Sequence, residues 1–126
     1  MQGLHLTADL GGCDAAYAPM HDAQALRALC RAGVEAAGLR AVGDLFHGFA
    51  GGGVTGVVLL AESHLAVHTW PELGAVTLDV YVCNRGADNG ARAERLMAAL
   101  EAAFGAPRAT RQRLARELPA LPPAAS

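Results

Sequence analysis

The stretch LLAESHLAVHTWPE, Leu59 to Glu72, gathers side chains that can attack carbonyls, transfer protons and carry charge. The hydroxyl of Ser63 directly follows the carboxylate of Glu62, and the imidazole of His68 lies five residues further on. A serine in a strained turn, with a proton-transfer group nearby, can attack the preceding carbonyl carbon and convert the amide into an ester. The chain could therefore cut itself between these two residues.

Simpler interpretations of the same side chains remain open. His64 and His68 could be strand histidines with satisfied hydrogen bonds, and Cys83 a small buried apolar residue. A metal site made of the three is disfavoured, because four residues of strand separate the two histidines by about 13 Å. We therefore expect no metal ion.

The elements that must position these groups follow from the spacing of apolar residues. A period of two predicts strands at Gly3–Leu10, Ala41–His47, Val54–Ala61, Leu65–Trp70 and Val76–Cys83. A helical period predicts helices from about Asp22 to Gly38 and from Asp88 to Phe104. This order predicts an α+β fold, an antiparallel β-sheet with two helices packed on one face.

The last predicted strand indicates which groups lie on the face that the helices leave uncovered. Four valine and leucine residues between positions 76 and 82 have one parity, and Thr77, Asp79, Tyr81 and Cys83 have the other. By the same alternation, His68 shares the second face. That face should be polar or be covered by another subunit.

Composition narrows the class of protein. The chain has 126 residues, 52% of them hydrophobic and 17% charged, and a formal net charge of -2. These values suit a single domain spanning residues 1–126 and give no charge excess for nucleic-acid binding. No apolar run approaches the roughly 20 residues that span a bilayer, so we expect a cytoplasmic protein that binds no membrane.

Residue usage adds three expectations. Three cysteines without paired spacing predict free thiols. All 10 basic side chains are arginines, so pyridoxal phosphate has no lysine to hold it, and amine chemistry would need another carbonyl. The segment after Gly105 is rich in Arg, Ala and Pro, so we expect residues 106–126 to form a flexible tail with a short helix at Thr110–Glu117.

Three motifs together resemble the bacterial family of pyruvoyl-dependent S-adenosylmethionine decarboxylases, in its short proenzyme form. They are ESH at Glu62, HTWPE at His68 and LDVYVC ending at Cys83. The resemblance covers about Gly3 to Phe104 and implies the same α+β sandwich. It also implies cleavage into chains 1–62 and 63–126, and a homodimer whose sheets face each other and whose sites take groups from both subunits.

The resemblance implies a role for each matching residue. Ser63 becomes the pyruvoyl group, a self-generated cofactor that forms a Schiff base with the substrate. His68 is the proton acceptor in processing, Cys83 is the proton donor in catalysis, and Thr55 assists processing where many relatives carry serine. For substrate binding, Phe49 stacks on adenine, Trp70 meets the sulfonium through its ring face, and Glu72 accepts from both ribose hydroxyls, with His5 near the pocket.

The implied activity is conversion of S-adenosylmethionine to its decarboxylated form, the aminopropyl donor for spermidine biosynthesis. Two alternatives remain: a decarboxylase of ornithine or arginine on the same scaffold, and an uncleaved inactive paralogue. Phe49, Trp70 and Glu72 favour the nucleoside substrate. Two departures stand out, since many relatives have a basic residue in place of Leu4, beside His5, and a glycine in place of Asn84.

Overall fold

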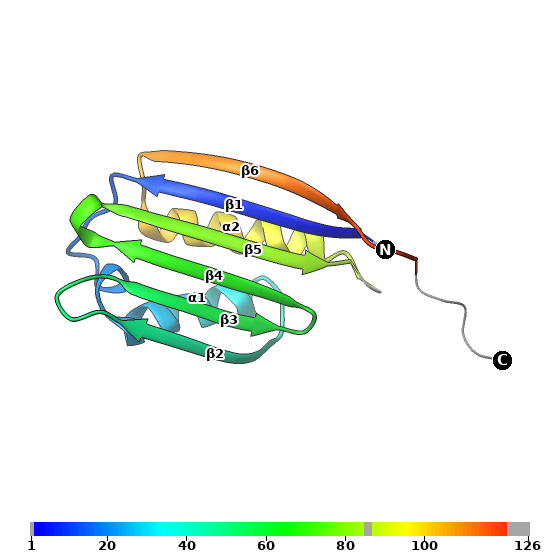
Figure 1. Ribbon diagram of the computed structural model, residues 1–126, viewed down its shortest axis with the longest axis horizontal. Helices are drawn as coiled ribbons and strands as arrows, with labels where there is room; N and C mark the ends of the chain where they lie inside the picture. Colours follow the sequence, from blue (N-terminus) through cyan, green and yellow to red (C-terminus); the bar gives the residue numbers. More distant parts are fainter. Residues whose placement is uncertain (1, 85–86, 121–126) are drawn as a thin grey trace.

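The computed structural model describes residues 2–84 and 87–120, which form one antiparallel sheet backed by two helices (Figure 1). Strand order across the sheet is β2-β3-β4-β5-β1-β6. The elements are β1 (Gln2–Gly11), α1 (Ala23–Ala36), β2 (Ala41–Gly48), β3 (Val54–Leu60), β4 (Ser63–Trp70), β5 (Ala75–Cys83), α2 (Asn89–Phe104) and β6 (Arg108–Glu117), with 3₁₀ turns at Ala18–Met20 and Pro71–Leu73. The predicted α+β fold is confirmed.

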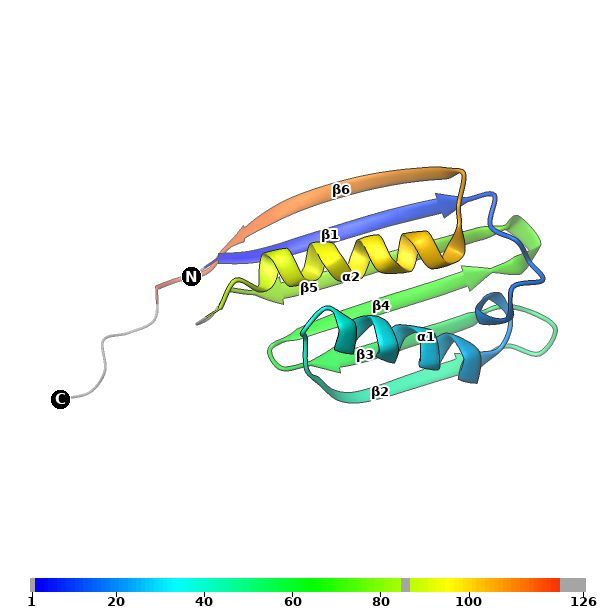
Figure 2. The ribbon, with the colours of Figure 1, turned by 180° about the vertical axis from the view of Figure 1, so that it is seen from behind.

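Both helices begin and end where local side chains and glycines set the boundary. The carboxylate of Asp22 accepts hydrogen bonds from the backbone N–H groups of Gln24 and Ala25 at the start of α1. Asp88 caps α2 in the same way, and Gly105 ends it with a φ of 60°. Figure 2 shows α1 lying over the β2–β4 side of the sheet and α2 over the β1–β5 side.

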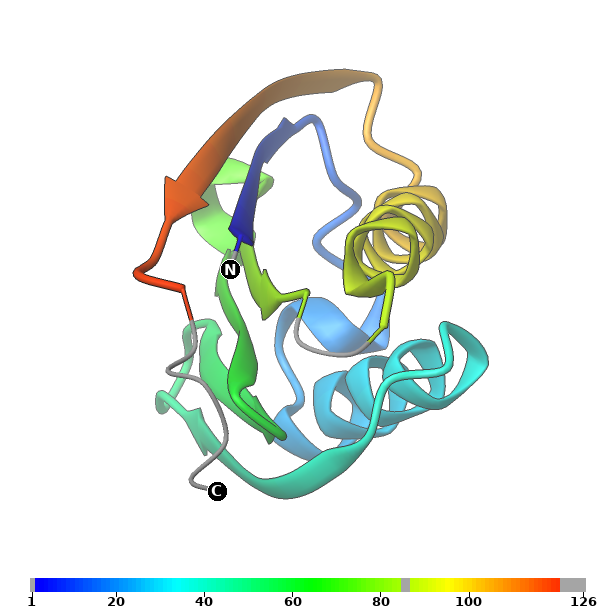
Figure 3. The same cartoon turned by 90° about the vertical axis from the view of Figure 1, so that its right-hand side faces the viewer.

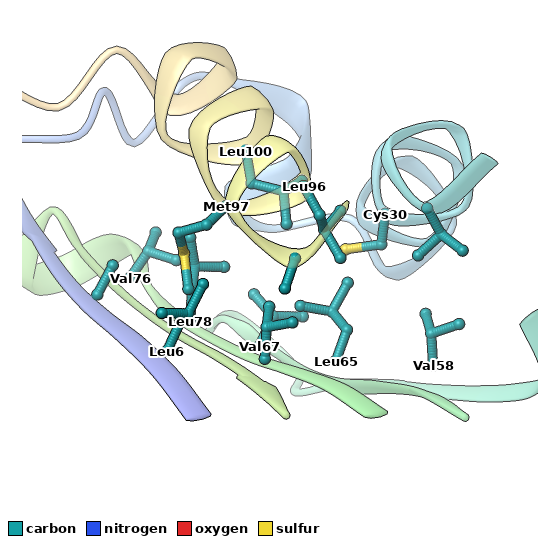
Figure 4. Close-up of a cluster of buried hydrophobic side chains, with 14 of the residues drawn as sticks. Leu6, Cys30, Val58, Leu65, Val67, Val76, Leu78, Leu96, Met97 and Leu100 are labelled. Atoms are coloured by element: carbon teal, nitrogen blue, oxygen red, sulfur yellow. The ribbon is translucent and has the colours of Figure 1, made fainter. Parts of the chain in front are cut away.

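The core lies between the helices and one face of the sheet (Figure 4). Alternate residues of the central strands point into it, such as Leu65 and Leu78, which are at most 1% exposed. They meet Cys30 of α1 and Leu96 of α2, which are fully buried. Neither α1 nor α2 lies on the opposite face, as the end-on view in Figure 3 shows, and the candidate site lies on that face.

The expectation of a flexible tail with a short helix at Thr110–Glu117 is wrong for the residues that form β6. This strand pairs antiparallel with β1 along its whole length, from Gln2 opposite Glu117 to Gly11 opposite Arg108. It covers what would otherwise be an unpaired edge of β1. The last six residues of the expected tail, 121–126, lie outside the described residues.

Two ion pairs hold β6 against the helix layer. The guanidinium of Arg111 donates to Glu101 of α2 at 2.7 Å, and Arg113 pairs with Glu94 of the same helix. The strand has no apolar alternation because most of its side chains face solvent, which explains why sequence periodicity does not reveal it. In the described part of the chain, no helix is both long and apolar enough to cross a membrane.

Candidate active site

The hairpin between β3 and β4 is strained at the residue before Ser63. Leu60 pairs with Ser63, so Ala61 and Glu62 form a two-residue turn. Glu62 has a φ of 59°, and it is the only non-glycine residue with positive φ among the described residues. A left-handed conformation costs an L-residue with a side chain about 1–2 kcal/mol. The strained turn that the sequence suggests therefore occurs at the predicted cleavage site.

Ser63 opens onto a cavity of about 460 Å³ on the uncovered face. We call this the Ser63 cavity, and β1, β4, β5, β6 and the hairpin turn all contribute to it. Its lining residues are His5, Glu62, Ser63, His64, Tyr81 and Arg116. The structure thus places His5, expected near the substrate, beside the serine expected to become the pyruvoyl group.

A single carboxylate holds the two imidazoles of this cavity. The Oδ1 atom of Asp79 accepts from Nε2 of His5 at 2.7 Å and from Nε2 of His64 at 3.3 Å. The ring of Tyr81 stacks on His64 with centroids 5.8 Å apart and meets the His5 ring edge-on at 6.1 Å. These contacts fix the orientation of both imidazoles. Sequence alternation placed Asp79 and Tyr81 on this face but gave them no part in the site.

A second cavity, of about 340 Å³, lies at the opposite end of the same face. We call it the His68 cavity, and it brings together five of the residues predicted from the sequence. Its lining residues are Phe49, Gly52, Gly53, Thr55, His68, Thr69, Trp70 and Glu72. The processing residues and the expected nucleoside-binding residues are thus neighbours.

Contacts within the His68 cavity orient its imidazole. Oγ1 of Thr55 and Nδ1 of His68 share a hydrogen bond of 3.1 Å, because the two residues are directly opposite in the β3–β4 ladder. The His68 ring also stacks on Trp70, with centroids 5.8 Å apart and planes at 29°. Gly53 is required here, since a Cβ at this position would lie 1.9 Å from the carbonyl oxygen of Thr69.

Ser63 and His68 do not meet within one chain. They stand at opposite ends of β4, five residues apart, which corresponds to about 16 Å of extended strand. The two cavities share no lining residue. Each cavity by itself lacks a group that the expected chemistry requires.

Cys83 lies at the Ser63 end of the sheet and is 6% exposed. It ends β5 opposite Gly3, and its carbonyl accepts a hydrogen bond from Asn89. It does not line either cavity, so the structure does not place its thiol beside Ser63. It shares the face of His68 by alternation, but six residues of β5 separate it from Thr77, the residue opposite His68.

Burial favours the protonated form of the other two cysteine thiols. All three cysteines are free, as predicted. Burial raises the pKa of the Cys13 thiol and raises that of Cys30 to about 12. At neutral pH, Cys30 in the core is therefore a protonated, apolar side chain.

Leu4 does not face the Ser63 cavity, although it adjoins His5 in sequence. It is 5% exposed and belongs to the hydrophobic core on the helix side, opposite Val82 and Ala115. The position at which many relatives carry a basic residue therefore lies in the core of this chain, outside the lining of the Ser63 cavity. Arg116, by contrast, lines the Ser63 cavity and was missed because its segment was expected to be a tail.

Among the described residues, no three His, Cys, Asp or Glu side chains are grouped to hold a metal.

Comparisons with known proteins agree with this architecture. The family model for S-adenosylmethionine decarboxylase matches residues 4–117. The S-adenosylmethionine decarboxylase proenzyme of Aquifex aeolicus (strain VF5) is 46% identical over 81 residues, which are 64% of this chain and 58% of that protein. The proenzyme of Sulfurihydrogenibium sp. (strain YO3AOP1) is 43% identical over 81 residues, 64% of this chain and 59% of that protein.

A solved structure extends the likeness to nearly the whole fold. The crystal structure of the adenosylmethionine decarboxylase from Aquifex aeolicus VF5 matches with a TM-score of 0.79 at 33% identity, covering 98% of this chain and 96% of that one. The aligned part of the curated relatives is only about three fifths of their length, 58% and 59% for the two above. With its antiparallel sheet and strained Glu-Ser hairpin, the chain is a small α+β protein. It belongs to the S-adenosylmethionine decarboxylase family.

Proposed function

We propose that this protein is a self-processing, pyruvoyl-dependent decarboxylase that converts S-adenosylmethionine to decarboxylated S-adenosylmethionine. The observation that carries the proposal is the positive φ of Glu62 directly before the Ser63 hydroxyl, at the edge of a cavity. Strain at this position raises the energy of the intact peptide and is released when the bond is cut. The family membership supports the same assignment.

Processing requires three steps from the chain's own groups. The Ser63 hydroxyl attacks the Glu62 carbonyl carbon, and the bond to the Ser63 nitrogen breaks, leaving an ester and a free amine. A base removes the Ser63 α-proton, which expels the Glu62 carboxylate from the β-carbon. The resulting dehydroalanine takes up water and releases ammonia, leaving a pyruvoyl group on the second chain. This carbonyl supplies the electron sink for decarboxylation when the substrate amine condenses with it.

We assign the base to His68, which must come from a second subunit. Its Nδ1–H can donate to Thr55, and Nε2 is then free to accept the α-proton. The distance along β4 prevents this within one chain, but two sheets packed face to face and related by a two-fold axis bring the Ser63 cavity of one against the His68 cavity of the other. We therefore propose a homodimer with two composite sites.

The uncovered face supports such packing. It combines polar groups with apolar side chains that are exposed in the single chain, including Leu45 at 70%, Leu59 at 51% and Leu114 at 55%. These belong to β2, β3 and β6, so the apolar contribution spreads across the sheet. A partner sheet would remove that area from water.

The residues of the His68 cavity support a nucleoside substrate. Phe49 is 53% exposed and can stack on adenine, Trp70 presents its ring to a sulfonium, and Glu72 can accept from ribose hydroxyls. Ornithine and arginine have no adenine, sulfonium or ribose for these groups to bind. They remain the second candidate substrates because they share the amine and carboxylate that the Ser63 end would handle.

Two measurements test the proposal. Intact mass after expression should show chains 1–62 and 63–126, the second beginning with pyruvoyl. Carbon dioxide release from S-adenosylmethionine, ornithine and arginine should then show turnover of the nucleoside. A persistent full-length chain would favour an inactive paralogue, and exclusive turnover of ornithine or arginine would favour the second candidate.

A further inference from the structure

The four arginines of β6 divide between the two faces of the sheet. Arg111 and Arg113 point to the helix side, where they pair with Glu101 and Glu94. Arg108 and Arg116 alternate onto the uncovered face, at opposite ends of the strand. Within the described residues, neither of these two makes an ion pair with a carboxylate. In this part of the chain, the uncovered face therefore has a guanidinium at each end of β6 that forms no ion pair with a described carboxylate.

Arg116 is distinguished from Arg108 by where it lies. It lines the Ser63 cavity and is the only arginine among the described residues that does so. Its guanidinium carbon sits 5.8 Å from the centre of the Tyr81 ring, and the same ring stacks on His64, the residue next to Ser63. This stack of cation, phenol and imidazole holds a positive charge over the cavity and leaves its N–H groups available to an anion.

We propose that Arg116 binds the α-carboxylate of the substrate, an assignment that rests on the proposed decarboxylase function. The substrate amine reacts at position 63, and its carboxylate is attached to the same carbon as that amine. The carboxylate must therefore lie within a few bond lengths of position 63, inside the Ser63 cavity. A guanidinium binds a carboxylate through two parallel hydrogen bonds, which fits this requirement.

This contact exists only before the reaction. The bond between the α-carbon and the carboxylate breaks, its electron pair stays with the substrate, and carbon dioxide leaves without charge. Arg116 then has no anion to bind, so the product loses this interaction and the substrate keeps it. Arg116 is thus expected to determine selection of α-amino acids and to have little effect on affinity for carboxylate-free molecules.

The test compares Arg116→Gln with the parent enzyme, using three probe molecules. For S-adenosylmethionine the measured quantity is kcat/KM. For S-adenosylmethionine methyl ester and decarboxylated S-adenosylmethionine it is the inhibition constant. Loss of a charge-assisted carboxylate contact should lower kcat/KM about 10- to 100-fold through KM. Both inhibition constants should change less than about twofold, because neither inhibitor carries the carboxylate. Arg116→Lys should recover part of the loss.

Arg108→Gln is the matched control, since it removes an arginine from the same strand and face at the other end. It should behave as the parent does. Intact mass of each variant reports the pyruvoyl content, to which rates are normalised. Equal losses for S-adenosylmethionine and the two carboxylate-free probes would overturn the proposal, and so would a variant whose only defect is slow cleavage.

The carboxylate that cleavage creates on Glu62 is a competing partner for Arg116. It is present with every probe, so it cannot produce a difference between the acid and its methyl ester. If the parent turns over ornithine or arginine instead, the same comparison uses that amino acid and its methyl ester. A parent enzyme without pyruvoyl would contradict both the proposed function and the role of Arg116. If the parent is active and Arg116→Gln has the same kcat/KM, only the role of Arg116 is contradicted.

Discussion

The two ends of the uncovered face differ in the kind of work their residues can do. The Ser63 end has a strained backbone at Glu62, a nucleophile and two imidazoles bound to Asp79. The His68 end has the carboxylate of Glu72, aromatic rings and an imidazole hydrogen-bonded to a hydroxyl. The Ser63 end carries the bond that we propose is cut, whereas the His68 end combines the proposed base with the groups proposed to bind the nucleoside. Because about 16 Å of extended strand separates the two ends, the site proposed above would take groups from two copies of the chain.

The most decisive test of this difference between the two ends combines two variant chains, one altered at Ser63 and the other at His68. Ser63→Ala alone should give a folded, uncut chain, because only the attacking hydroxyl is lost. His68→Ala alone should stall at or before the ester, because the elimination lacks its base. Co-expressed with different affinity tags, the two should form mixed dimers in which one composite site has both lesions and the other has none. About half of the activity per parent dimer should return, a gain of several orders of magnitude over either variant.

The mixed dimer also predicts which chain is cut. Only the His68→Ala chain should be cleaved, since it carries Ser63 and borrows its base from the partner. Mass spectrometry of the two tagged chains measures this directly. Absence of any cleavage in mixed dimers of confirmed composition would show that Ser63 and His68 act within one chain, contrary to the geometry described above.

The next largest effect concerns the thiol at the Ser63 end. We expect Cys83→Ser to leave cleavage largely intact and to slow turnover about 10² to 10⁴-fold, because a hydroxyl is a far weaker acid than a thiol. When the substrate α-carbon is protonated slowly, the proton should instead add to the pyruvoyl carbon at position 63 and convert it to alanine. Mass spectrometry should then find alanine at position 63 accumulating faster than in the parent.

Cys30→Ala provides the control for this variant. Cys30 is a fully buried residue of α1 on the core side of the sheet, so its thiol cannot reach a substrate on the uncovered face. Its loss should lower stability and leave turnover per folded enzyme unchanged. Parent-like turnover and termini in Cys83→Ser would assign the proton donation to another acid, such as Tyr81 or water.

A smaller effect should follow from changing the recognition end alone. Glu72→Gln removes one charged acceptor from the His68 cavity, so kcat/KM for S-adenosylmethionine should fall about 10-fold if the ribose hydroxyls bind there. Cleavage at Ser63 should proceed at the parent rate, as intact mass over time would show. Glu35→Gln, an exposed change on the helix side, is the matched control. A slowed cleavage in Glu72→Gln would contradict a role for Glu72 in ligand binding alone.

The sequence predicts the parts of the molecule that have an apolar period and misses those that do not. All five predicted strands and both helices are present within one or two residues, because their apolar residues recur with the period of a strand or a helix. β6 was missed because its side chains are exposed and its pairing with β1 is a long-range backbone interaction. Arg116 was missed with it.

Residue types point to the candidate site residues, but the distance between these residues follows only from the strand register. Strand alternation correctly placed His68 and Cys83 on one face, yet alternation does not tell which end of a face a residue occupies. The β4–β5 ladder shows that the two lie at opposite ends. The positive φ of Glu62 could be suspected from a turn that lacks glycine and asparagine, but only the backbone shows which residue carries the strain.

The smallest expected effect isolates that strain. Glu62→Gly and Glu62→Ala both remove the side chain, but only glycine adopts a φ of 59° without steric cost. In the uncleavable Ser63→Ala background, the glycine variant should be more stable by about 0.5–1 kcal/mol, which corresponds to a melting temperature a few degrees higher. With Ser63 present, the glycine variant should also be cut more slowly than the alanine variant, because the intact peptide no longer stores this energy. Calorimetry and a cleavage time course measure the two quantities, and equal values for glycine and alanine in both would show that the backbone at Glu62 does not drive the reaction.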